Sequence, residues 1–61
     1  MTDRELLKEA LTHEETAVRL YRQYAREADD PKVQEMFSQF AMNESWHAAA
    51  IRAKLEKREP S

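Results

Sequence analysis

The sequence predicts an all-α fold, an antiparallel hairpin of two helices. The 61 residues include no glycine, and the two prolines are Pro31, near the midpoint, and Pro60, near the end. On both sides of Pro31, apolar residues recur at alternating steps of three and four, the period of an amphipathic helix. Only Asp29-Asp30-Pro31 separates these two segments. Because so short a connection forces consecutive helices to fold back on one another, we expect an antiparallel pair.

The first helix is expected over about residues 3–28. Thr2 and Glu5 have the spacing of a capping box, in which each side chain binds the backbone N–H of the other residue. The steps between the expected inward positions are close to those of a heptad seam. These positions are Leu7, Leu11, Glu14, Val18, Tyr21, Ala25 and Ala28. One carboxylate, Glu14, therefore falls in a core position, whereas its neighbour Glu15 is expected to face outward.

The second helix is expected over about residues 31–57. Asp30 suits the N-cap and Pro31 suits the first helical position. Lys54, Lys57 and Arg58 would favour the negative end of the helix dipole, and 59–61 would form a frayed tail. The inward positions are Val33, Phe37, Phe40, Ala41, Glu44, His47 or Ala48, Ile51 and Leu55. We find no linker or composition change, so residues 1–61 are expected to form a single hairpin unit.

Composition excludes several classes of function. Charged residues make up 36% of the chain but alternate in sign around a net charge of −2, which gives no support to nucleic-acid binding. No run is long and apolar enough to span a membrane or to act as a signal peptide, and we expect a cytoplasmic protein. The absence of cysteine excludes disulfides, thiolate zinc sites and iron–sulfur clusters. So short a chain buries little surface alone, so we expect self-association.

Three side chains are candidate metal ligands. Glu44 and His47 are three residues apart, so they share one face of a helix. Glu14 lies 16 residues before Asp30, while Glu44 and His47 lie 14 and 17 residues after it. In an antiparallel hairpin all three would therefore lie at nearly the same level. A buried, unpaired carboxylate costs several kcal/mol, which is comparable to the stability of a small domain. A bound cation would compensate for that cost.

A two-fold dimer would double this ligand set to four glutamates and two histidines. This is the set of di-iron carboxylate bundles, in which two helices each give a Glu and two others each give Glu-x-x-His. Such a site would hold two ions about 3.5–4 Å apart. Oxygen-rich ligands with one imidazole per ion favour iron or manganese over zinc, although other divalent metals could bind. We therefore expect a homodimer, or a higher multiple of dimers, with a di-iron centre at its interface.

The sequence also resembles a known superfamily. The spacing Glu14-x-x-Ala17-x-x-x-Tyr21-x-x-Tyr24-Ala25 is followed by Phe37-x-x-Phe40-Ala41-x-x-Glu44-x-x-His47-Ala48. Together these segments resemble the ferritin-like superfamily, especially rubrerythrin. The short turn and lone hairpin are also similar to encapsulated ferritin, whose subunits complete a di-iron site by pairing. The resemblance implies a ferritin-like four-helix bundle formed by two hairpins, with Glu14, Glu44 and His47 as iron ligands and catalytic residues.

The activity implied by the resemblance is ferroxidase activity, the oxidation of Fe(II) to Fe(III), with a role in iron homeostasis. A protein shell is a possible further partner, with the protein inside a nanocompartment. Two other functions remain open. One is a rubrerythrin-like peroxide reductase that takes electrons from an external donor. The other is a non-catalytic helical assembly module.

Each candidate residue also has a purely structural interpretation. Glu44 and His47 could form a solvated surface pair. Glu14 could pair with Arg22 or Arg52 of a partner chain and so fix the register of a coiled coil.

Residues near the candidate ligands also have two interpretations. Tyr21 is expected mainly to pack, with a hydrogen bond to a metal ligand as the other role. Trp46 points away from Glu44 and His47, where it could cover a subunit interface or lie on the surface. His13 is expected to face solvent.

Overall fold

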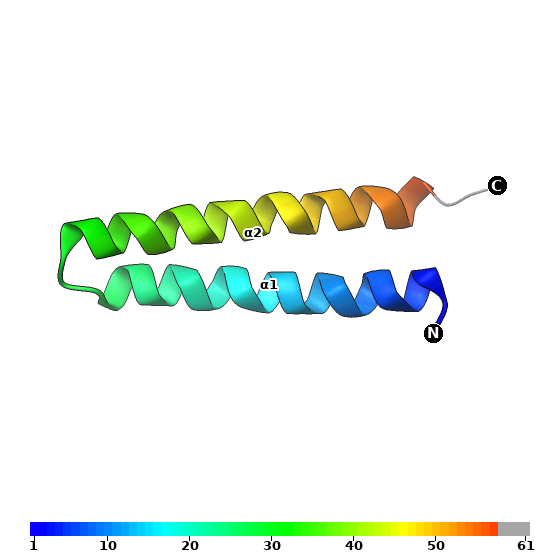
Figure 1. The fold of residues 1–61 in the computed structure, drawn as a ribbon, viewed down its shortest axis with the longest axis horizontal. Helices are drawn as coiled ribbons and strands as arrows, with labels where there is room; N and C mark the ends of the chain where they lie inside the picture. Colours follow the sequence, from blue (N-terminus) through cyan, green and yellow to red (C-terminus); the bar gives the residue numbers. More distant parts are fainter. Residues whose placement is uncertain (58–61) are drawn as a thin grey trace.

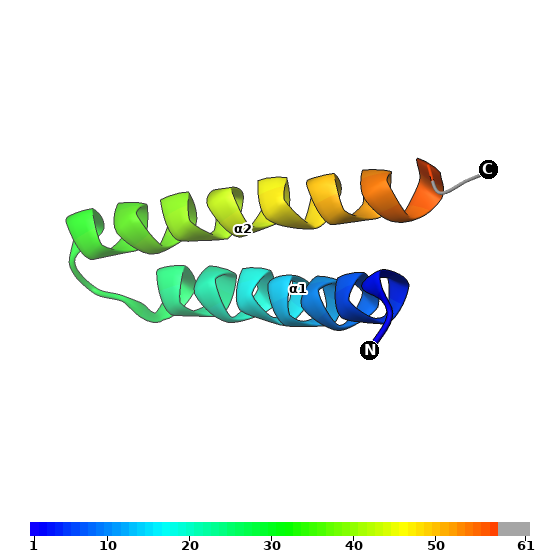
Figure 2. The ribbon, with the colours of Figure 1, turned by 45° about the vertical axis from the view of Figure 1, so that its right-hand side comes forward.

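The computed structural model is an antiparallel hairpin of two long helices that lie side by side over their full length (Figure 1). Helix α1 spans Asp3–Glu27 and helix α2 spans Pro31–Lys57. The structure describes residues 1–57, so the expectations for Arg58 and for the tail 59–61 lie outside the described residues. No strand occurs in the described part of the chain. The start of α1 and the end of α2 lie at the end of the hairpin opposite the turn, as the rotated view also shows (Figure 2).

Helix α1 begins at the predicted capping box. The Glu5 backbone N–H donates to Thr2 Oγ1 at 3.1 Å, and the Thr2 backbone N–H donates to Glu5 Oε1 at 2.8 Å. Two of the N–H groups that no helical carbonyl can reach are satisfied in this way. The helix ends one residue before the expected position, because Ala28 has already left the helical region at φ −68° and ψ 141°.

The turn is held by hydrogen bonds on both sides of Pro31. Asp30 acts as the predicted N-cap of α2, since its Oδ1 accepts from the Lys32 N–H at 2.9 Å and its carbonyl accepts from Gln34 N–H at 2.9 Å. The Gln34 side chain reaches back and donates to the Ala28 carbonyl at 2.7 Å. This bond joins the start of α2 to the end of α1. The reversal is therefore fixed by its own polar groups, without glycine.

The interior of one hairpin is small. Within residues 1–57 the buried apolar residues are Val18, Ala41 and Ala48, and no large side chain is fully buried. Most other inward positions are half-buried, as expected for a helix pair that leaves part of each apolar stripe open. A cluster of aromatic rings lies between the site and the turn, formed by Tyr21, Tyr24, Phe37 and Phe40 with ring centroids 5.4–6.2 Å apart. No helix in the described part is long and apolar enough to cross a membrane.

Candidate metal centre

Helix α1 contributes one carboxylate to the middle of the hairpin. Glu14 lies on the inward stripe one turn before Val18, and its side chain is half-buried at 26% exposure. The stripe is otherwise apolar at this level, so the carboxylate occupies a position where packing alone would favour leucine or alanine. This is the position that heptad spacing predicts for Glu14.

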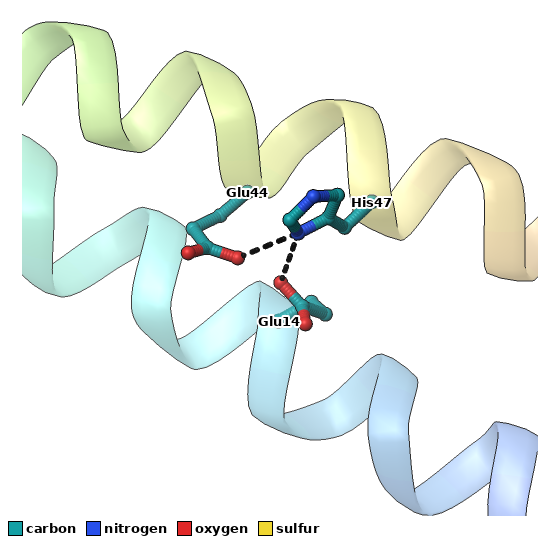
Figure 3. A group of neighbouring side chains, drawn as sticks. All are labelled: Glu14, Glu44 and His47. Atoms are coloured by element: carbon teal, nitrogen blue, oxygen red, sulfur yellow. Dashed lines mark hydrogen bonds and ion pairs between the residues drawn. The ribbon is translucent and has the colours of Figure 1, made fainter.

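Helix α2 contributes a second carboxylate and an imidazole. Glu44 is half-buried to the same extent as Glu14, whereas the His47 side chain is 62% exposed. The spacing left either His47 or Ala48 as the inward residue, and the structure shows that Ala48 is inside. His47 lies at the open edge of the interface between the helices. From this edge its ring turns back toward both carboxylates (Figure 3).

The three side chains converge on one another from the two helices. His47 Nδ1 lies 3.1 Å from Glu44 Oε1 and 3.5 Å from Glu14 Oε1. One ligand atom from each residue lies within 4.8 Å of the other two. Counting residues from the turn placed these three side chains at one level of the hairpin. The structure shows that they are also close together in space. With His47 62% exposed, the described residues leave this side of the cluster open to water.

Ionising both neighbouring carboxyl groups is costly, because the side chains around them donate few hydrogen bonds. Glu14 Oε1 is buried and has no hydrogen-bond partner within the described residues. The adjacent Glu44 carboxyl raises the pKa of Glu14, and burial raises it further. The adjacent Glu14 carboxyl and the contact with His47 lower the pKa of Glu44. Of the two carboxyls in the metal-free pair, Glu14 therefore holds its proton to the higher pH.

The donor atoms fit a divalent cation. Ligands about 2.1 Å from a metal lie about 3.0 Å apart in an octahedron and about 3.4 Å apart in a tetrahedron. The separations of 3.1 Å and 3.5 Å from His47 Nδ1 to the two glutamate oxygens lie close to this range. A cation here would also contact the Glu14 oxygen that has no hydrogen-bond partner in the described residues. Two carboxylates with one imidazole suit Fe(II) or Mn(II).

An ion pair closes the opposite side of the hairpin at the same level. Arg52 Nη2 donates to Glu15 Oε2 at 2.9 Å, which joins α2 to α1. Glu15 is 42% exposed, as expected for a residue beside the inward stripe, but its carboxylate is held by this ion pair. Sequence spacing placed it about 100° from Glu14 but could not show that Arg52 reaches the same place from α2. Within its own chain Arg52 pairs with Glu15, and pairing of Glu14 with an arginine of a partner chain stays a prediction.

Two nearby residues behave as packing or surface groups. The Tyr21 ring stacks on Phe37 and meets Phe40 edge to face. In the described part of the chain no hydrogen bond joins Tyr21 to the three candidate ligands, so its expected hydrogen-bonding role stays a prediction. His13 is exposed, as expected from its position beside the inward stripe.

Comparisons with known proteins support one family. The model of the family described as Rubrerythrin matches residues 5–61. No curated protein matches the chain significantly, and no solved structure does so. The family match covers both helices and includes Glu14, Glu44 and His47. Since it extends over nearly the whole sequence, the chain belongs to the rubrerythrin family.

Proposed function

We propose that two copies of this chain pair through the side that bears His47, bind iron between them, and oxidise Fe(II) to Fe(III). The observation on which this proposal depends is the group Glu14, Glu44 and His47, with its buried and unpartnered carboxylate oxygen. Rubrerythrin-family proteins typically bind iron, which agrees with this donor set. The ferroxidase reaction is our inference from the ligands and from the family.

A second copy is proposed because the site is open where ligands are still needed. One hairpin supplies two carboxylates and one imidazole, fewer than the six ligands of a di-iron carboxylate site. The open side also carries a row of mostly apolar residues, of which the larger ones are exposed. We name this row the pairing face; it comprises Leu6, Ala10, Ala17, Tyr24, Met36, Phe40 and His47. Two such faces together would form a four-helix bundle and enclose the site.

Each ligand has a distinct part in the proposed reaction. Glu44 is held as the anion, since its hydrogen bonds lower its pKa, and it is available to an incoming cation. Glu14 binds a cation as the carboxylate, so its raised pKa makes iron binding compete with protonation. His47 supplies a ring nitrogen at the accessible edge. Carboxylates stabilise Fe(III) more than Fe(II), which favours the loss of an electron from the substrate.

The proposed reaction balances with a two-electron oxidant. Two Fe(II) ions give one electron each, and O₂ with two protons accepts them to form H₂O₂. A pair of hairpins would enclose no mineral cavity, so storage of the Fe(III) product would require a surrounding protein shell. Such a shell is part of the proposal.

The central test is anaerobic Fe(II) titration, with molecular mass measured on the same sample. We expect two Fe(II) per dimer for the native chain. Glu44→Ala, Glu14→Ala and His47→Ala should each abolish stoichiometric uptake. Glu9→Ala is the matched control, because it removes an exposed glutamate of α1 that lies outside the site. Retention of two irons per dimer in Glu44→Ala would overturn the assignment.

The same preparation distinguishes the alternative functions. After anaerobic loading, oxidation of Fe(II) is followed with O₂ and, separately, with H₂O₂ in the presence of a reductant. Faster turnover with O₂ supports the ferroxidase, and faster sustained turnover with H₂O₂ indicates a peroxide reductase. A dimer that forms without metal and takes up no Fe(II) would be a helical assembly module.

A further inference from the structure

A second surface lies on the other side of the hairpin from the pairing face. Three arginines follow one side of α1 at steps of three and four: Arg19, Arg22 and Arg26. They line an open groove of about 560 Å³ on α1. Arg22 also lines a groove of about 310 Å³ between the helices, where it lies with Met42 and Ser45 of α2. Arg22 thus belongs both to the row of arginines on α1 and to the groove shared with α2.

The α2 part of this surface is apolar and exposed. Met42 is 55% exposed and Trp46 is 68% exposed. They are four residues apart, so they share one side of α2. Trp46 is about 200° around the helix from Glu44. Pairing through the His47 side would therefore leave Met42 and Trp46 uncovered. We name Arg19, Arg22, Arg26, Met42 and Trp46 together the arginine face.

The arginines of this face have no acidic partners within residues 1–57. The ion pairs of that region join His47 to Glu14 and Glu44, and Arg52 to Glu15. Arg19 makes one weak contact, in which Nη2 lies 3.4 Å from Thr16 Oγ1. The nearby Glu27 accepts a hydrogen bond from Gln23. A net-negative chain thus presents three guanidiniums in a row without neutralising them.

We propose that the arginine face binds an acidic segment of another protein. Carboxylates of that segment would bind the forked guanidiniums, which match carboxylate geometry. An apolar side chain of the segment would enter the groove beside Met42 and contact Trp46. Tryptophan and arginine are the residues that most often dominate binding energy at interfaces. The surface is small, which suits a transient partner.

Charge makes other occupants less suitable. A symmetric contact between two arginine faces would bring two rows of guanidiniums together, and like charges repel. Nucleic acids and anionic membranes attract basic surfaces, but they would also meet the negative charge of the rest of the chain. These two partners are therefore treated as competing outcomes of the test.

Trp46 is the only tryptophan, so its fluorescence reports on this face alone. The probe is a short synthetic peptide with glutamates on one side of a helix and leucines on the other. Its glutamine counterpart serves as the neutral probe. We expect a saturable blue shift with the acidic peptide, a weaker one with the neutral peptide, and weakening by salt. The triple variant Arg19→Gln, Arg22→Gln, Arg26→Gln should lower the affinity by about tenfold.

The matched control is Lys8→Gln, Lys54→Gln, Lys57→Gln. It removes the same charge from the end of the hairpin away from the turn and should change the affinity by less than about twofold. Circular dichroism checks that both variants remain helical. An equal loss in the two triple variants would overturn the proposal, as would no saturable shift with the acidic peptide. Tighter binding of duplex DNA or of phosphatidylglycerol vesicles than of the peptide would also overturn it. Glu44→Ala should bind the peptide normally, so this proposal and the iron proposal fail independently.

Discussion

At the scale of single residues, Glu14 and Glu44 differ in protonation because of what surrounds each of them. Glu14 has a buried oxygen without a hydrogen-bond partner in the described residues, whereas a Glu44 oxygen lies at hydrogen-bond distance, 3.1 Å, from His47 Nδ1. The pKa of Glu14 is therefore raised and that of Glu44 is lowered. Two neighbouring carboxyls that titrate together share their protons as a pair. The site therefore favours binding a positive charge, either a proton or a metal ion.

Glu14→Gln is expected to stabilise the metal-free protein at neutral pH. A raised folded pKa means that ionisation of Glu14 opposes folding, so this destabilisation is absent below the unfolded pKa and grows as pH rises through the folded pKa. Glutamine resembles the protonated form at every pH. The midpoint of thermal unfolding should rise by a few degrees, a change of roughly 1 kcal/mol in a domain this small.

The comparison variant for this prediction is Glu44→Gln. The lowered pKa of Glu44 means that its ionised form supports folding above the unfolded pKa, and this support is lost as pH falls through the folded pKa. Glu44→Gln should therefore fail to stabilise the protein at neutral pH. Equal stabilisation by both variants would show that the two carboxyls are equivalent.

Metal binding is expected to release protons. Because the pKa of Glu14 is raised, metal must displace a proton at pH values just above the ordinary glutamate range. The affinity for Co(II), used as a redox-stable substitute for Fe(II), should therefore rise with pH through that region. Calorimetric titration in two buffers with different ionisation enthalpies measures the number of protons released. A binding enthalpy that is identical in the two buffers would contradict the predicted proton release.

At the scale of the elements, each helix is delimited by polar groups at its ends. Thr2 and Glu5 satisfy backbone N–H groups at the start of α1, and Asp30 does so for α2. Gln34 then binds the carbonyl of Ala28 across the turn. These contacts set where each helix begins and ends. They thereby place Glu14 and Glu44 at one level, since depth in a hairpin is counted from the turn.

Thr2→Ala is expected to destabilise the protein by about 1 kcal/mol through loss of the capping box. Hydrogen exchange should speed up in the first turn of α1 and remain unchanged near Glu14. Thr12→Ala is the control, since Thr12 lies inside the helix and its hydroxyl donates to the Lys8 carbonyl at 3.2 Å. Removing that bond should cost little, because alanine is the better helix former. A greater loss of stability in Thr12→Ala would show that the cap is not a main source of stability.

At the scale of the whole molecule, one hairpin buries very little. Val18, Ala41 and Ala48 form its buried apolar interior, while Met36, Tyr24 and Phe40 of the pairing face remain exposed. Burial of apolar surface is the main favourable contribution to folding, and short chains often obtain it by oligomerising. Self-association is therefore expected to contribute to folding itself as well as to the site.

The proposed dimer makes stability dependent on protein concentration. Met36→Gln should weaken dimerisation by about tenfold, because Met36 lies eleven residues before His47 on the same row of α2 and each copy contributes one methionine. Sedimentation velocity over a range of concentrations gives the dissociation constant. Met42→Gln changes the same residue type on the arginine face and should leave dimerisation unchanged. Pairing through this face is excluded if the two substitutions weaken dimerisation equally. It is also excluded if the native chain is monomeric at every concentration.

The sequence alone determined most features that depend on one helix at a time. The capping box, the Asp30 N-cap and the position of the turn were predicted from residue type and spacing, and the structure confirms them. The level of each candidate ligand along the hairpin was obtained by counting residues from the turn. These levels correctly brought Glu14, Glu44 and His47 near one another, although their role as ligands stays a prediction. Such features are local because backbone geometry fixes rise and rotation per residue.

Only the tertiary structure decided how the two helices are rotated against each other. Spacing could not choose between His47 and Ala48 as the inward residue, and packing placed Ala48 inside and His47 at the edge. Residue spacing likewise could not show that Arg52 pairs with Glu15, or that Arg22 and Met42 line one groove. The physical reason is that a helix fixes angles about its own axis alone. The rotation of one axis relative to the other is set by the fit of side chains between the helices.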